Sequence, residues 1–168
     1  MMKYMQWMSP LGQLYLAASG RGLAGVYFEQ HRHFKGLQDW QQTTADSLLL
    51  DTAAQLQDYF AGSLQEFTIP LDLSAGTPFQ QAVWYELLRI PYGRTCSYGE
   101  LANALGKPQA VRAVGAANGR NPVSVIVPCH RVIAASGALT GYAGGLKNKQ
   151  ALLKLEAEKD GFSENFLI

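Results

Sequence analysis

Cysteine is scarce in this chain of 168 residues, which holds only Cys96 and Cys129. Two cysteines cannot build the framework of several disulfides that holds small secreted domains together. The sequence therefore predicts a protein of a reducing compartment, and we expect a cytoplasmic one. Soft metal ligands are equally few, because only three histidines accompany the two cysteines.

Long apolar runs are also missing. No stretch approaches the roughly 20 consecutive apolar residues that a membrane-spanning helix needs. Residues 1–7 lack the apolar core of a secretory signal peptide. We therefore expect no membrane partner. Hydrophobic residues still make up 48% of the chain, which is enough for a substantial core in one domain or in two small ones.

Net charge is nearly absent, at +1, and taken alone it argues against a nucleic-acid-binding protein. Its distribution points the other way. Residues 1–88 carry a balance of −4, residues 89–154 carry +8 with Glu100 as the single acid, and residues 155–168 carry −3. A basic middle segment masked by acidic ends favours a polyanionic partner, although a solvated charged face would look the same.

The first part of the chain has the pattern of a small α/β unit. Residues 2–8, 13–18 and 23–28 read as strands separated by turn signals, which predicts an antiparallel meander. Residues 46–61 have helical spacing with a capping Asp46. A further short strand is expected over residues 67–69.

A loop after the third predicted strand contains His31 and His33. Two histidines at this spacing invite a metal interpretation, but no cysteine or carboxylate stands at a suitable spacing. We therefore interpret both as loop residues and expect no metal site.

A composition break at residues 71–76 predicts two domains, 1–73 and 74–168. The second opens with Thr77-Pro78-Phe79-Gln80, which has the pattern of a capped helix start. Ser97-Tyr98-Gly99-Glu100 is a second capping box, and a further helix is expected over residues 109–118. Two short helices joined by a turn with glycine predict a helix-turn-helix. The predicted fold class is α+β: an antiparallel-sheet α/β domain and then a mainly helical one.

The second of these short helices is poor in groups that read base edges, because Arg112 is its only charge. Its small residues would allow the close approach to a backbone that a minor-groove binder needs. They would equally suit a tightly packed buried helix, and spacing alone does not separate the two interpretations.

The most distinctive stretch is 121–132. Its apolar run, residues 123–127, predicts a short buried strand that stops at Pro128 and presents Cys129 at its end. A cysteine reacts as the thiolate, and His130 or Arg131 would favour that form if either pointed at the sulfur. The plain alternative is a small buried hydrophobic residue.

Residues 128–132 resemble the acceptor motif of the O6-alkylguanine-DNA alkyltransferases, also called methylated-DNA–protein-cysteine methyltransferases. The resemblance covers roughly residues 77–156. It includes four further motifs in family order: Ser97 to Ala102, Arg112 to Gly115, Asn121-Pro122, and Gly141 to Leu146.

The resemblance implies direct and irreversible transfer of an alkyl group from O6-alkylguanine in double-stranded DNA to Cys129. O4-alkylthymine stays open as a second substrate. Each molecule would act once, as a monomer and without a cofactor. By the same resemblance Glu156 orients His130, which deprotonates Cys129 through a water, and Tyr98 assists base flipping and donates a proton to the guanine.

The family pattern also assigns the DNA-contacting residues. Arg112 matches the arginine that fills the base stack after the nucleotide is extruded, and a surface phosphate contact is its alternative. Ala110, Ala113 and Gly115 belong to the helix that would lie in the minor groove.

Five residues are assigned to the substrate pocket and hinge by the resemblance. They are Asn121, Val132, Tyr142, Ala143 and Gly144. Asn121 would tie the helix-turn-helix to the acceptor segment as a structural hinge, and the glycine-rich loop would form a pocket wall.

Two other functions compete with alkyl transfer. A non-catalytic helix-turn-helix lesion sensor or regulator would have no use for Cys129. A Cys-His hydrolase would need an oxyanion hole and would turn over repeatedly.

Overall fold

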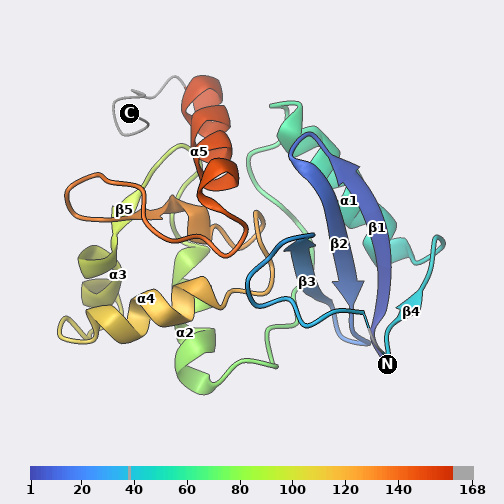
Figure 1. Cartoon of the computed structure of the whole chain (residues 1–168), viewed down its shortest axis with the longest axis horizontal. Coiled ribbons are helices and arrows are strands. Elements are labelled where there is room, and N and C mark those ends of the chain that lie inside the picture. The colour runs from blue at the N-terminus through green and yellow to red at the C-terminus, as the bar shows by residue number, and fades with distance from the viewer. Residues whose placement is uncertain (38, 161–168) are drawn as a thin grey trace.

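The computed structural model describes residues 1–37 and 39–160. Figure 1 shows β1–β4 with α1 on one side of the molecule and α2–α5 on the other. We call these the sheet half and the helical half. Within the described residues, no helix is both long and apolar enough to cross a membrane.

The sheet half contains the predicted antiparallel meander. Strands β1 (Lys3–Ser9), β2 (Gly12–Ala18) and β3 (Leu23–Phe28) pair in order along the chain. The tight connection between β1 and β2 ends at Gly12, whose φ of 109° suits a residue without a Cβ. A fourth strand that we did not predict, β4 (Gln41–Gln42), pairs in parallel with β1. The sheet is therefore mixed, with the order β3-β2-β1-β4.

Helix α1 (Ser47–Phe60) confirms the predicted helix and its cap, since the Asp46 side chain accepts a hydrogen bond from the Leu49 N–H. Its buried face includes Leu56 and Tyr59 and packs on β1 and β2.

The strand expected over residues 67–69 is wrong. Only Leu71 pairs, in a single bridge with Leu23. Pro70 has no N–H to donate, so it can offer β3 only its carbonyl, which accepts from the Leu23 N–H.

The helical half consists of α2 (Pro78–Leu87), α3 (Tyr98–Ala104), α4 (Val111–Gly119) and α5 (Leu146–Asp160). Both predicted capping boxes are present, at the starts of α2 and α3. Helices α3 and α4 pack together as the expected pair, and α2 packs on α4. Helix α4 begins later than predicted, because the chain first makes a turn in which Ala110 N–H donates to Lys107 O.

The strand predicted over residues 123–127 is also wrong. This stretch is a tight turn in which Val127 N–H donates to Val123 O and Val125 has a φ of 71°. Only Val123 makes a strand-like bridge, to Val26 of β3. The valines of this stretch are buried between the two halves. A buried segment is apolar whether it forms a turn or a strand, so the apolar run did not distinguish the two.

After this turn, a 3-10 helix, η1 (Cys129–Arg131), leads into β6 (Val132–Ile133). Strand β6 pairs in parallel with β5 (Cys96–Ser97). The two strands form a small sheet that we did not predict. Because β5 directly precedes α3, this pairing holds the start of α3 beside residues 123–131, the tight turn and η1 together, which we call the cysteine turn.

One continuous hydrophobic core joins the two halves. It contains Leu16 and Val26 of the sheet, Leu56 of α1, Leu87 of α2 and Val123 of the turn, all fully buried. The cysteine turn therefore lies against the sheet half and is held from both sides.

The α2 capping box predicts a measurable contribution to stability. Thr77→Ala removes the oxygen that accepts from Gln80 N–H, and we expect the free energy of unfolding to fall by about 1 kcal/mol. Urea denaturation measures the change. Thr77→Ser keeps the acceptor and should stay close to the parent protein, and equal losses for both variants would contradict the capping role.

Candidate active site

Cys129 is the first residue of η1, and only 5% of it is exposed. Its Sγ accepts a hydrogen bond of 3.1 Å from Asn121 Nδ2. The same amide nitrogen donates to Val127 O at 2.8 Å, and Asn121 Oδ1 accepts from Val123 N–H at 3.0 Å. Asn121 therefore closes the turn, as a hinge would, and also contacts the sulfur, which we did not foresee.

The surroundings of Cys129 disfavour the thiolate. Burial raises the pKa of the thiol to about 11, although the Asn121 hydrogen bond and the positive charge of Lys149 act in the opposite direction. At neutral pH the group is therefore a thiol in the protein alone. Nucleophilic chemistry at this sulfur requires a base that takes the proton.

His130 follows directly and is fully buried. Its Nε2 lies 2.7 Å from Glu156 Oε2. An ionised carboxylate can only accept, so Nε2 carries the hydrogen and Nδ1 keeps its lone pair. Within the described part of the chain, Nδ1 has no hydrogen-bond partner. Burial lowers the pKa of His130 and outweighs the opposing effect of Glu156, so the imidazole is neutral and Nδ1 is its basic atom.

Glu156 is 1% exposed and binds three side chains. Besides His130, it accepts from Arg131 Nε at 2.8 Å and Nη2 at 3.0 Å, and from Tyr59 Oη at 2.5 Å. Burial by itself would raise the pKa of Glu156, but His130 and Arg131 together outweigh it and hold that pKa below its usual range. Glu156 is therefore ionised.

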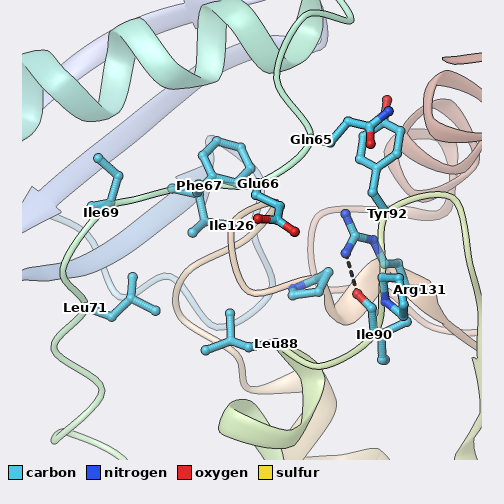
Figure 2. Close-up of a pocket in the computed structure, with 12 residues that line it drawn as sticks. Gln65, Glu66, Phe67, Ile69, Leu71, Leu88, Ile90, Tyr92, Ile126 and Arg131 are labelled. Atoms are coloured by element: carbon cyan, nitrogen blue, oxygen red, sulfur yellow. Dashed lines mark hydrogen bonds between the residues drawn. The ribbon is translucent and has the colours of Figure 1, made fainter. Parts of the chain in front are cut away.

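Arg131 is held by Glu156 and by Ile90 O, so the condition for a direct effect of Arg131 on the thiolate, that it point at the sulfur, is not met. Its guanidinium binds Glu156, donates to Ile90 O at 2.7 Å and lies over the Tyr92 ring at 5.7 Å. Arg131 also lines a hollow of about 460 Å³. Figure 2 shows Arg131 on the opposite side of this hollow from Ile69 and Leu71. The lining residues of this hollow include no cysteine, serine or histidine, and Cys129 does not border it.

Two contributors to the site were missed from the sequence. Tyr59 comes from α1 of the sheet half, 97 residues before Glu156, and nothing local marks it. Lys149 is fully buried, and its Nζ donates to Val132 O at 2.7 Å and Thr140 O at 2.8 Å. Burial lowers its pKa to about 8. A signal existed for Lys149, because it lies two helical turns before Glu156 on the same face of α5.

Four of the expected residues line one hollow of about 320 Å³: Tyr98, Gly115, Tyr142 and Ala143. The Tyr98 hydroxyl accepts from Thr140 Oγ1 at 3.3 Å. The hollow therefore joins the start of α3, the middle of α4 and the loop before α5.

Val132 and Gly144 are not in this hollow. Val132 is fully buried in β6. Gly144 packs against the sheet half, where an added Cβ would lie 2.5 Å from Phe28 Cδ2. An added Cβ would also lie 2.9 Å from Tyr142 Cε2, so close packing against β3 and against Tyr142 accounts for the glycine.

The expected DNA-contacting residues are accessible on α4. Arg112 and Ala113 are exposed, and Ala110 is half-buried at the N-cap. Arg112 has no carboxylate partner among the described residues. Its role in the base stack stays a prediction.

Metal ligands do not gather in the described part of the chain, where no three His, Cys, Asp or Glu residues could hold an ion. His31 is buried, unlike an ordinary loop histidine, and its Nδ1 accepts from His33 N–H.

Fold and site together define a protein whose helix-turn-helix half carries a buried cysteine backed by a histidine–carboxylate pair. Two family models cover nearly the whole chain. The 6-O-methylguanine DNA methyltransferase DNA binding domain matches residues 78–158, and the ribonuclease-like domain of the same proteins matches residues 2–73.

Comparison with individual relatives indicates the same family as the two family models. The methylated-DNA–protein-cysteine methyltransferase of Mycobacterium tuberculosis is 50% identical over 151 residues, 90% of each chain. That of Methanosarcina acetivorans is 47% identical over 156 residues, 92% of this chain and 98% of the relative. The M. tuberculosis OGT structure in complex with DNA superposes with a TM-score of 0.87, at 47% identity and 98% coverage of both chains. The chain belongs to the methylated-DNA–protein-cysteine methyltransferase family.

The raised pKa of Cys129 predicts a distinct pH dependence of its reactivity. The thiolate fraction grows about tenfold per pH unit below the pKa, so alkylation by iodoacetamide should keep rising between about pH 7 and pH 9.5. Peptide mapping by mass spectrometry separates Cys129 from Cys96, and Cys129→Ser is the control. A plateau below about pH 8 would contradict the assignment.

The contact between Tyr59 and Glu156 predicts an energetic coupling between the two halves. Tyr59→Phe removes a donor to a buried carboxylate, which should cost about 1.5–3 kcal/mol of unfolding free energy. The same substitution in a Glu156→Gln background should cost less, and urea denaturation of all four proteins gives the coupling. Strictly additive losses would mean that the hydrogen bond contributes nothing.

Proposed function

We propose that this protein repairs double-stranded DNA by taking the alkyl group from O6-alkylguanine onto Cys129. The observation that carries the proposal is the histidine–carboxylate pair next to the cysteine in the chain. His130 follows Cys129 directly, is held by Glu156 at 2.7 Å, and keeps Nδ1 as its basic atom. A purely structural cysteine needs no such base.

The lesion reaches the site by base flipping. The O6 atom lies inside the duplex, so the nucleotide is extruded at a cost of a few kcal/mol. Helix α4 lies in the minor groove with Ala110, Ala113 and Gly115 toward the DNA. Arg112 enters the stack, because its planar guanidinium can stack on bases and donate to the orphaned partner.

The extruded guanine occupies the hollow between Tyr98 and Tyr142. His130 takes the proton of Cys129 through a water. The sulfur then forms a bond to the alkyl carbon, the carbon–O6 bond breaks, and its electron pair stays on the guanine. Tyr98 donates a proton to the leaving guanine and is reprotonated from solvent, to which His130 releases the proton it took from Cys129. Overall one proton passes from the thiol to the guanine, so no co-reactant is consumed.

The product thioether at Cys129 has no thiol, so each molecule acts once and no cofactor is needed. A monomer suffices, because every residue of the relay comes from one chain. The two thiols are unpaired, which suits the reducing cytoplasm.

We divide the chain into domains 1–73 and 74–168.

Stoichiometry tests the function most directly. When the protein is mixed with excess duplex DNA carrying O6-methylguanine, intact-mass and peptide spectrometry should show one added CH2 at Cys129. The DNA should lose one methyl group per protein molecule, and Cys129→Ala should transfer none.

Cys96→Ala is the matched control and should transfer as well as the parent protein, since Cys96 has no part in the relay. Repair with an unmodified Cys129, or several turnovers per molecule, would refute the function and favour a hydrolytic enzyme instead.

A further inference from the structure

The hollow in which we place the guanine has a further wall besides those from α3, α4 and the loop before α5, and this wall comes from the sheet half. Arg32 and His33, in the loop after β3, line the hollow together with Arg120, which follows α4. Tyr98 and Tyr142 stand in the same hollow. Cationic side chains from both halves of the molecule therefore border the place where an extruded nucleotide enters.

The loop that carries Arg32 and His33 is held in position by the site. Arg32 N–H donates to Ala143 O at 2.9 Å. His31 is buried, accepts from His33 N–H at 3.1 Å, and hydrogen-bonds the backbone of Asn121. The loop is thus tied to the pocket loop and to the residue that contacts the sulfur. Such preorganisation lowers the entropy cost of binding a ligand there.

The charges of this rim are uncompensated. Arg32 and Arg120 are exposed, and neither has a carboxylate partner within the described residues. The residues that line the hollow include no acid. Burial and then the charges of Arg120 and Arg32 lower the pKa of His33, which places all three groups within electrostatic reach of one another. Clustered like charges repel, and an anion among them would relieve the repulsion.

An extruded nucleotide brings such an anion, because it stays covalently linked to its two flanking phosphates when the base turns out of the stack. We propose that Arg32, His33 and Arg120 form a phosphate-binding rim for the backbone of the flipped nucleotide, so that the sheet half contacts DNA directly. Arginine suits this role, since its guanidinium binds phosphate oxygens in a bidentate manner. The proposal rests on the proposed function and adds a second contact region to helix α4.

Comparing two substrates tests the rim. Arg32→Ala/Arg120→Ala should lower the second-order rate of methyl transfer from duplex O6-methylguanine DNA by about tenfold or more, because two phosphate contacts are lost. Transfer from the free O6-methylguanine base, which has no phosphate, should stay within about twofold of the parent protein. Arg21→Ala, an exposed arginine elsewhere in the sheet half, is the matched control and should change neither rate.

A DNA-binding measurement tests the same rim independently of methyl transfer. In a Cys129→Ala background, the slope of log affinity for the lesion duplex against log salt should fall by about one for each arginine removed. Equal losses with DNA and free base would show a role in pocket structure and overturn the proposal. Unchanged DNA rate and salt slope would overturn it too. If Cys129 of the parent protein is not methylated at all, the proposed function itself fails.

Discussion

A single buried carboxylate holds this structure and its site together. Glu156 accepts hydrogen bonds from Tyr59 of the sheet half and from His130 and Arg131 of the cysteine turn. A buried charge is tolerated only when it is paired and fully hydrogen-bonded. Removing any of the three donors should therefore destabilise the fold, and the Glu156 carboxylate also fixes the tautomer of His130. Through Tyr59 and Glu156, the sheet half is linked to the candidate site around Cys129 and His130.

Burial of the cysteine disfavours its reactive thiolate form. Burial raises the pKa of Cys129, so few thiolates are available to stray electrophiles. A protein that is consumed by each reaction benefits from such protection. Asn121 donates to the sulfur and also closes the preceding turn. The side chain that donates a hydrogen bond to the sulfur is thus the same one that sets the position of the sulfur.

Much of the fold was predictable because its signals are local. The β1–β3 meander and the capping boxes of α2 and α3 follow from side-chain alternation and from caps within four residues of each other. The failures have a common cause. The run 123–127 carries the apolar pattern of a strand, but that pattern reports burial and does not report the partner. Asn121 and the opposing half turned it into a closed loop, and no local pattern contains that information.

By itself the sequence determined the motif around Cys129, the helix-turn-helix and the basic middle segment, because each depends on neighbouring residues. His130 and Glu156 were paired only by resemblance, and the structure brings them within 2.7 Å. Tertiary structure alone decided that Arg131 binds Glu156, that Tyr59 reaches across 97 residues, and that Arg32 borders the same hollow as Tyr98. The physical reason is that hydrogen bonds and charges act over a few ångströms in space, and only packing of the two halves sets those distances.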